Sequence, residues 1–200
     1  MGIFRRRTTD RAPDAPPPDS PPPSPQPVSL DDQIGTLTGF GLRPVGDPVA
    51  TAQTWWPRER FEADPFATLL TVEDWSQDLK SLGDLEILDE FAIYADVLRG
   101  LAEFTGQSHR LGEIITALES QDAETGAVIA QIDGRQRSYQ PDYRGDWADG
   151  MAIAEMAEDL AAPGRVVVSS FIRGAFVLAH LPADREADYL AFIAPYEGLD

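Results

Sequence analysis

Hydrophobic residues between positions 147 and 181 first follow a helical period and then the pattern of two strands. A helix is expected over Asp149–Ala161, with Asp149 as its N-cap and a Pro-Gly pair as its stop. Two runs of β-forming residues follow, 166–168 and 175–181, and Arg173-Gly174 lies between them. We therefore predict a helix followed by a β-hairpin.

The rest of the chain predicts three further helices and three further strands. The helices are expected over 71–82, 84–104 and 183–194, and the strands over 111–119, 127–133 and 135–140. The order helix, three strands, helix, two strands, helix predicts an α+β domain over residues 67–200. We expect a mainly antiparallel sheet of about five strands, with helices packed on one face (α-βββ-α-ββ-α).

The helix expected over 84–104 carries hydrophobic residues on two faces. Leu88, Phe91, Leu98 and their neighbours form a stripe that is typical of a core-facing helix. Ile93, Val97 and Phe104 form a second strip on a different face. Either the aromatic segment before residue 67 or a second subunit, in a homodimer, is expected to cover this strip.

Two segments precede the predicted domain. Residues 1–30 are rich in proline and poor in residues to bury, which predicts a disordered, partly polyproline II tail. Glycine and proline interrupt every period in residues 31–66, so an irregular, aromatic-containing segment that wraps the core is expected there. Trp55 and Trp56 in this segment either plug the core or form an exposed anchor for a partner.

The net charge of −18 is the strongest global property of the chain. Residues 1–30 hold four arginines and three aspartates, a net of +1, so the remaining residues carry about −19. Such a body repels phosphate backbones and attracts basic proteins, so we expect a basic protein partner and no nucleic acid. Acidity that only maintains solubility is the alternative reading.

The first eleven residues do not predict a membrane anchor. Arg5, Arg6 and Arg7 follow Met1 almost at once, without the apolar core of a secretory signal. Three or four basic residues attach only weakly to an anionic membrane, and Arg6 breaks the myristoylation pattern. We expect a cytoplasmic protein without membrane contact through residues 1–11.

No catalytic or metal-binding motif is found in the sequence. There is no cysteine, and the two histidines are His109 and His180. His180 shares a strand face with Phe176 and Leu178, which favours a packed histidine over a metal ligand. Ser169-Ser170 has no nucleophile elbow around it. We therefore expect no catalytic residues, no metal and no cofactor.

One loop remains a candidate for small-molecule chemistry. The segment Asp142–Trp147 connects the predicted third strand to the next helix and holds Tyr143, Asp146 and Trp147. These side chains could close over the mouth of the sheet in a ligand sensor or a hydrolase. They are equally candidates, with Trp55 and Trp56, for contacts to a protein partner.

The element order over roughly residues 84–195, together with the acidity, resembles the type III secretion chaperone and YbjN-like fold. Many domains of that fold dimerise through a helix and the sheet edge. The resemblance implies a protein that holds or escorts another protein without chemistry. Toxin-immunity proteins have the same general character.

The sequence thus predicts a non-enzymatic, acidic protein-binding module that caps or escorts a basic partner, in the manner of a chaperone or an immunity protein. Two alternatives stay open. One is a ligand sensor or hydrolase that uses the Asp142–Trp147 loop. The other is a structural component of a larger assembly, tethered through the proline-rich segment.

Overall fold

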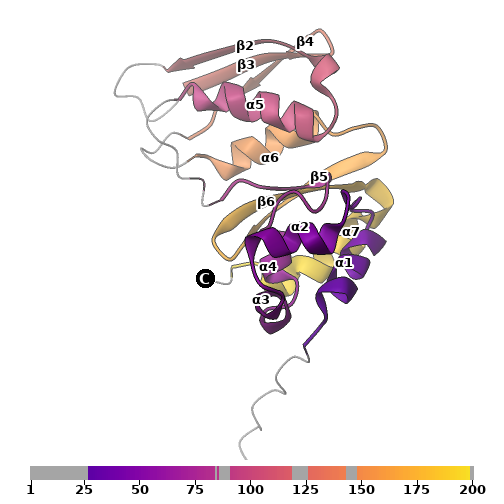
Figure 1. Ribbon diagram of the computed structural model, residues 1–200. Helices are drawn as coiled ribbons and strands as arrows, with labels where there is room; N and C mark the ends of the chain where they lie inside the picture. Colours follow the sequence, from indigo (N-terminus) through magenta and orange to yellow (C-terminus); the bar gives the residue numbers. More distant parts are fainter. Residues whose placement is uncertain (1–26, 84, 86–90, 119–125, 143–147, 199–200) are drawn as a thin grey trace, which may run out of the picture.

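The computed structural model describes residues 27–83, 85, 91–118, 126–142 and 148–198. Two antiparallel three-stranded sheets alternate with two layers of helices (Figure 1). The upper sheet has the order β2 (Leu111–Leu118), β3 (Gly126–Ile132), β4 (Arg135–Tyr139). The lower sheet has the order β1 (Leu79–Ser81), β6 (Ala175–Pro182), β5 (Arg165–Ile172).

The helices form one layer between the sheets and one below the lower sheet (Figure 1). Helices α5 (Ile93–Phe104) and α6 (Gly150–Asp159) lie between the sheets. The lower layer contains α1 (Leu30–Gly39), α2 (Pro48–Trp55), α3 (Arg58–Ala63), α4 (Ala67–Leu70) and α7 (Glu186–Ile193). Three short 3-10 helices are found at Ser108–Arg110, Ala183–Arg185 and Ala194–Tyr196.

The α+β class is confirmed, but the strands do not form one five-stranded sheet with helices on one face. Strand β6 is buried on both sides, with Phe176 and Leu178 facing the layer of α5 and α6. Val177, Ala179 and Leu181 face the lower helices. A near-continuous hydrophobic run of this kind is typical of a strand that is covered on both faces. The lower sheet therefore divides two hydrophobic cores.

Most of the elements predicted after residue 92 are found close to their expected positions. β2 pairs antiparallel with β3 and β3 with β4, in chain order, and β5 and β6 are joined at Arg173-Gly174. Asp149 caps α6 as expected, because its carboxylate accepts hydrogen bonds from the N–H groups of Met151 and Ala152. Tyr139 at the end of β4 donates to Asp159 of α6 at 2.9 Å, which ties the upper sheet to the helix below it.

The helix predicted over 71–82 is absent, and its last residues form β1 instead. Val72, Trp75 and Leu79 have helical spacing and are all buried. The chain between Thr71 and β1, however, consists of turns and bends instead of a helix. Asp74, within the expected helix, has a positive φ of 70° that no α-helix accommodates. Leu79 pairs with Ala179 of β6, so tertiary pairing overrides the local helical pattern here.

Residues 31–66 contain three of the helices rather than an irregular wrapping segment. Each helix is short: α1 ends at Gly39, Asp47 is the N-cap of α2, and Pro57 is the N-cap of α3. These short lengths and closely spaced boundaries conceal the helical period in the sequence. Phe61 and Phe66 from this segment are buried against the lower face of the sheet, as a plug would be. The segment therefore covers a core, but as a helical layer.

The second hydrophobic strip of α5 packs within the chain. Ile93, Val97 and Phe104 are half-buried and lie against the core between the two sheets. Residues 84 and 86–90, the first part of the helix predicted over 84–104, lie outside the described residues. In the part of the chain that the structure describes, none of the helices has the length and apolar character needed to span a bilayer.

Candidate functional site

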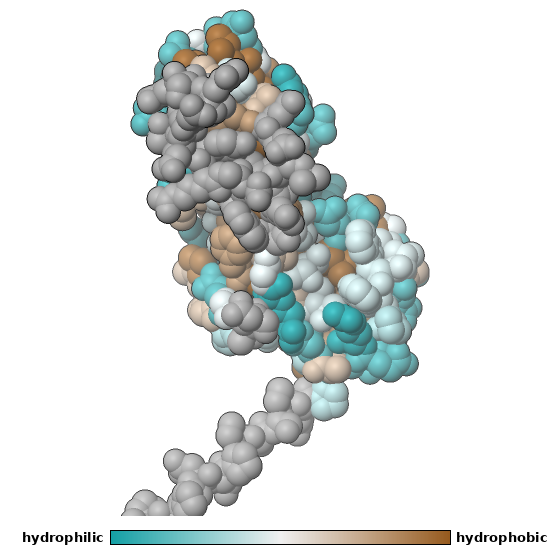
Figure 2. Space-filling view, turned by 90° about the vertical axis from the view of Figure 1, so that its left-hand side faces the viewer, coloured by the Kyte–Doolittle hydropathy of each residue, from teal (hydrophilic) through white to brown (hydrophobic). Residues whose placement is uncertain are grey.

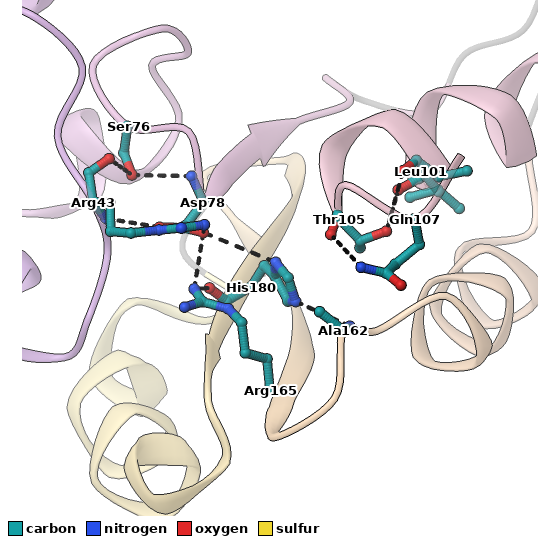
Figure 3. A network of polar contacts seen from close by, with 10 residues as sticks. Arg43, Ser76, Asp78, Leu101, Thr105, Gln107, Ala162, Arg165 and His180 are labelled. Atoms are coloured by element: carbon teal, nitrogen blue, oxygen red, sulfur yellow. Dashed lines mark hydrogen bonds and ion pairs between the residues drawn. The ribbon is translucent and has the colours of Figure 1, made fainter. Parts of the chain in front are cut away.

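The buried carboxylate of Asp78, just before β1, binds two arginines (Figure 3). Arg43 comes from the segment between α1 and α2, and Arg165 begins β5. Arg43 donates to Asp78 through its backbone N–H at 2.8 Å, through Nε at 2.7 Å and through a terminal nitrogen at 2.7 Å. Arg165 donates from the opposite side at 2.8 Å and also binds the carbonyl of His180. Four hydrogen bonds thus satisfy a carboxylate that has no exposed surface.

His180 lies beside this carboxylate and is only 2% exposed. Its Nδ1 is 3.9 Å from Asp78 Oδ1, and its Nε2 accepts a hydrogen bond from the Ala162 N–H at 3.4 Å. Burial, with a further contribution from Arg165, lowers the pKa of His180 from 6.5 to about 4. The packed histidine that the sequence predicted is therefore confirmed, and it is neutral near pH 7.

An aspartate beside a histidine is also the arrangement that activates a nucleophile in many hydrolases, but this pair lacks the remaining parts. The Nε2 atom that would accept a proton already binds a backbone amide, and the ring is closed to solvent. Ser76, the hydroxyl residue nearest to Asp78 in sequence, donates to the carbonyl of Arg43. We interpret the Asp78 network as a structural clamp that joins four segments of the chain.

A shallow groove lies at the N-terminal end of α6, and Met151 stands in its middle with 80% of its surface exposed. Two hollows of about 410 and 380 Å³ share Met151 and Asp149 in their walls, and together we call them the Met151 groove. The larger hollow is lined by Asp149, Gly150, Met151, Ser169, Ser170, Phe171, Phe176, Glu197 and Gly198. The smaller hollow is lined by Gln140, Asp149, Met151, Ala152, Ala154, Glu155 and Glu158.

The floor of the larger hollow is hydrophobic, and part of it is exposed. Phe171 of β5 is 46% exposed and packs against the buried Phe176, with ring centroids 5.0 Å apart. Figure 2 shows hydrophobic residues among polar ones in the lower half of the face that it draws.

The charged residues that line the Met151 groove in the described part of the chain are all acidic. They are Asp149, Glu155, Glu158 and Glu197, and no described arginine or lysine lines either hollow. Asp149 is engaged in capping α6 and also accepts from the Asp142 N–H at 3.0 Å. Glu155, Glu158 and Glu197 are exposed, and none of them forms an ion pair with another described residue. They leave a negative field over an apolar floor.

Strand β5 forms one wall of the groove and is an edge strand of the lower sheet. Gly198 donates its N–H to the Phe171 carbonyl at 3.2 Å, so the backbone groups of Phe171 point away from β6. Backbone groups two residues apart in a strand point to the same side, so those of Ser169 also point outward. No other described residue hydrogen bonds to them, and an extended segment could therefore pair there.

The residues chosen from the sequence are not brought together at this groove. Trp55 and Trp56 are 49% and 40% exposed on the lower helical layer, and the guanidinium of Arg60 lies 4.0 Å from the Trp56 ring centroid. Tyr143, Asp146 and Trp147, in the predicted Asp142–Trp147 loop, lie outside the described residues. Asp142 itself is half-buried.

Met151 and Phe171 were missed in the sequence, although each carried a signal. Met151, Glu155 and Glu158 recur at positions i, i+4 and i+7, which places a methionine on the acidic, outer face of the helix. Phe171 follows two serines at the end of a strand, on the same face as Ser169. The Asp78 clamp carried no local signal, because its members are far apart in the chain.

Within the described residues, no group of three or more histidine, aspartate or glutamate side chains could hold a metal ion. His109 is exposed at the 3-10 helix before β2. Comparison with family models, with curated proteins and with solved structures found no match to this chain.

Proposed function

We propose that this protein is a non-enzymatic protein-binding module, and that the Met151 groove holds a segment of a basic partner. The observation that supports the proposal most directly is the pairing of the exposed Met151 and Phe171 with a rim whose described charged residues are all carboxylates. Methionine and aromatic side chains are frequent at binding surfaces, because they adapt to a partner and bury a large area.

The chemistry of the groove selects a partner segment with two properties. One hydrophobic side chain fills the hollow between Met151 and Phe171, where its burial contributes roughly 1.5–3 kcal/mol. Arginine or lysine beside it approaches Glu155 and Glu197, which favours encounter with a basic chain over an acidic one. The outward backbone groups of Ser169 allow such a segment to pair as an added strand.

A module of this kind caps or escorts its partner, as chaperones and immunity proteins do, and the charge of the whole molecule supports that role. With a net charge of −18, the body attracts a basic protein over distances of a Debye length, about 10 Å at 0.1 M salt. The groove then supplies the short-range contact. The two parts predict different salt responses, since only the first is screened.

Site-specific photo-crosslinking tests the proposed function. A photoreactive phenylalanine analogue replaces Met151 in the full chain, and the chain is expressed and irradiated in its host cells. The expected adduct contains a peptide in which at least one arginine or lysine neighbours a hydrophobic residue. The matched control carries the same analogue at Leu190, which is 42% exposed on α7 and lies outside the groove.

Two results contradict the proposed function. In the first, the adducts at positions 151 and 190 are the same, which means that the groove selects nothing. In the second, the peptides joined to position 151 are acidic, which contradicts the charge complementarity, or they lack a hydrophobic residue, which contradicts the burial of a side chain in the hollow.

A further inference from the structure

We propose that residues 3–7 of this same chain, Ile3-Phe4-Arg5-Arg6-Arg7, occupy the Met151 groove when no partner is bound. The inference rests on the proposed function only in its choice of groove, and it requires no external protein. Residues 1–26 lie outside the described part of the chain, and the inference is drawn from their sequence and from the groove.

The sequence of residues 3–7 has the two properties that the groove selects. Ile3 and Phe4 are hydrophobic and match the floor at Met151 and Phe171. Three arginines follow directly, and they match the exposed carboxylates of the rim, Glu155 among them. The first carboxylate of the chain is Asp10, beyond the triplet. No other run of three basic residues occurs in the sequence.

The charges elsewhere on the described surface are less suitable for this segment. The guanidinium of Arg60 lies over the exposed Trp56 ring, so that aromatic surface already carries a cation, and nearby Arg58 is paired with Asp31 and Glu62. The edge strand β4 of the upper sheet carries the exposed Arg135 and Arg137. Among the described residues, the Met151 groove combines exposed hydrophobic side chains with carboxylates and no cation.

The length of the connecting segment permits this contact. Residues 8–29 include nine prolines, and in a polyproline II conformation they span at most about 70 Å. A body of about 170 residues has a radius of gyration of only about 16 Å, so every face is within reach. A tether of this length gives an effective concentration on the order of 1 mM, so a millimolar intrinsic Kd gives half occupancy.

Such a contact makes the N-terminal segment a competitor of the partner. With an effective concentration on the order of 1 mM and an intrinsic Kd between about 0.1 and 1 mM, partner affinity falls roughly two- to tenfold. The competition weakens at high salt, because three charges of the segment are screened.

Paramagnetic relaxation tests the contact in the full chain. The sequence has no cysteine, so Thr8→Cys provides a single site for a nitroxide label. At low salt we expect the amide signals of Met151, Glu155 and Ser169 to lose more than half of their intensity. The amides of Ile115 and Leu190, exposed elsewhere, serve as internal controls. The additional substitutions Arg5→Glu, Arg6→Glu and Arg7→Glu are expected to abolish the loss.

The inference is overturned if the broadening is uniform, is centred elsewhere, or persists in the charge-reversed chain. A mixing control distinguishes contact within one chain from contact between two copies. ¹⁵N-enriched chain without nitroxide is mixed with nitroxide-bearing chain of natural isotope content. The same broadening in this mixture also overturns the inference, because the segment then comes from a second copy. Failure here leaves the crosslinking result at position 151 unaffected, so the self-contact and the proposed function fail independently.

Discussion

At the scale of single residues, the described structure places its one fully buried carboxylate where two arginines and a histidine meet. Asp78 is satisfied by Arg43 and Arg165, and the neutral His180 fills the space beside them. Because an unpaired buried charge costs several kcal/mol, each member depends on the others. The cluster contributes to stability and to the alignment of the segments, and its burial separates it from any substrate.

Removal of the Asp78 carboxylate should therefore be costly. We expect Asp78→Ala to lower the free energy of unfolding by about 3–5 kcal/mol, because the largely buried Arg165 loses its counter-charge. Denaturation by urea, followed by circular dichroism, measures the change. Asp96→Ala is the matched control, since Asp96 pairs with Arg99 on an exposed helix surface and should change stability by less than about 1 kcal/mol. Equal effects of the two substitutions would refute the clamp.

His180 makes the stability of the protein dependent on pH. Its pKa is about 4 in the folded chain and 6.5 when exposed, so the unfolded chain binds more protons between these values. Stability is therefore fully present above pH 6.5 and decreases by roughly 3 kcal/mol in total as the pH falls to 4. Urea unfolding at several pH values should show this slope in the wild type and in His109→Gln, and a smaller slope in His180→Gln. An unchanged slope in His180→Gln would contradict the assignment.

At the scale of elements, local patterns predicted the helices and hairpins whose residues follow one hydrophobic period. They failed where pairing with residues distant in sequence determines the secondary structure. Helix α6 and the hairpin of β5 and β6 were predictable because a cap, a stop and a two-residue turn mark their limits. Strand β1 was not predictable, because Leu79 becomes a strand residue only by pairing with Ala179. The division into two sheets likewise depends on contacts far apart in sequence.

The candidate site was less predictable than the fold for the same reason. Glu155, Glu158 and Met151 share one helix, and their common face is visible in the sequence. That Phe171 and Glu197 lie against this helix follows only from the packing of β5 and the C-terminal segment. Chain neighbours such as Trp55 and Trp56 are conspicuous in the sequence, yet the structure places them on another surface.

The N-cap of α6 connects the stability of an element to the shape of the groove. The carboxylate of Asp149 accepts from Met151, Ala152 and Asp142, so Asp149→Ala frees three N–H groups. We expect a loss of about 1–2 kcal/mol and faster hydrogen exchange in the first turn of α6. Asp188→Ala, at an exposed position in α7, is the control and should change stability by less than about 0.5 kcal/mol. Unaltered exchange in α6 would contradict this role.

At the scale of the whole molecule, the layered fold and the charge act together. Two sheets enclose a helical layer, and the Met151 groove opens where that layer meets the edge of the lower sheet. A net charge of −18 favours encounter with basic chains over acidic ones. We propose that the groove converts this general attraction into a selective contact, since it adds hydrophobic side chains that an acidic surface alone lacks.

Chemical-shift mapping tests this central claim most directly. A peptide of two hydrophobic residues followed by three arginines is titrated in millimolar excess into the ¹⁵N-labelled full chain. We predict shifts confined to the amides of Met151–Glu155 and Ser169–Phe171, and a loss of affinity of at least tenfold in Met151→Asp. Shifts centred on Trp55 and Trp56, or an equal response to the same peptide with three glutamates, would contradict the account.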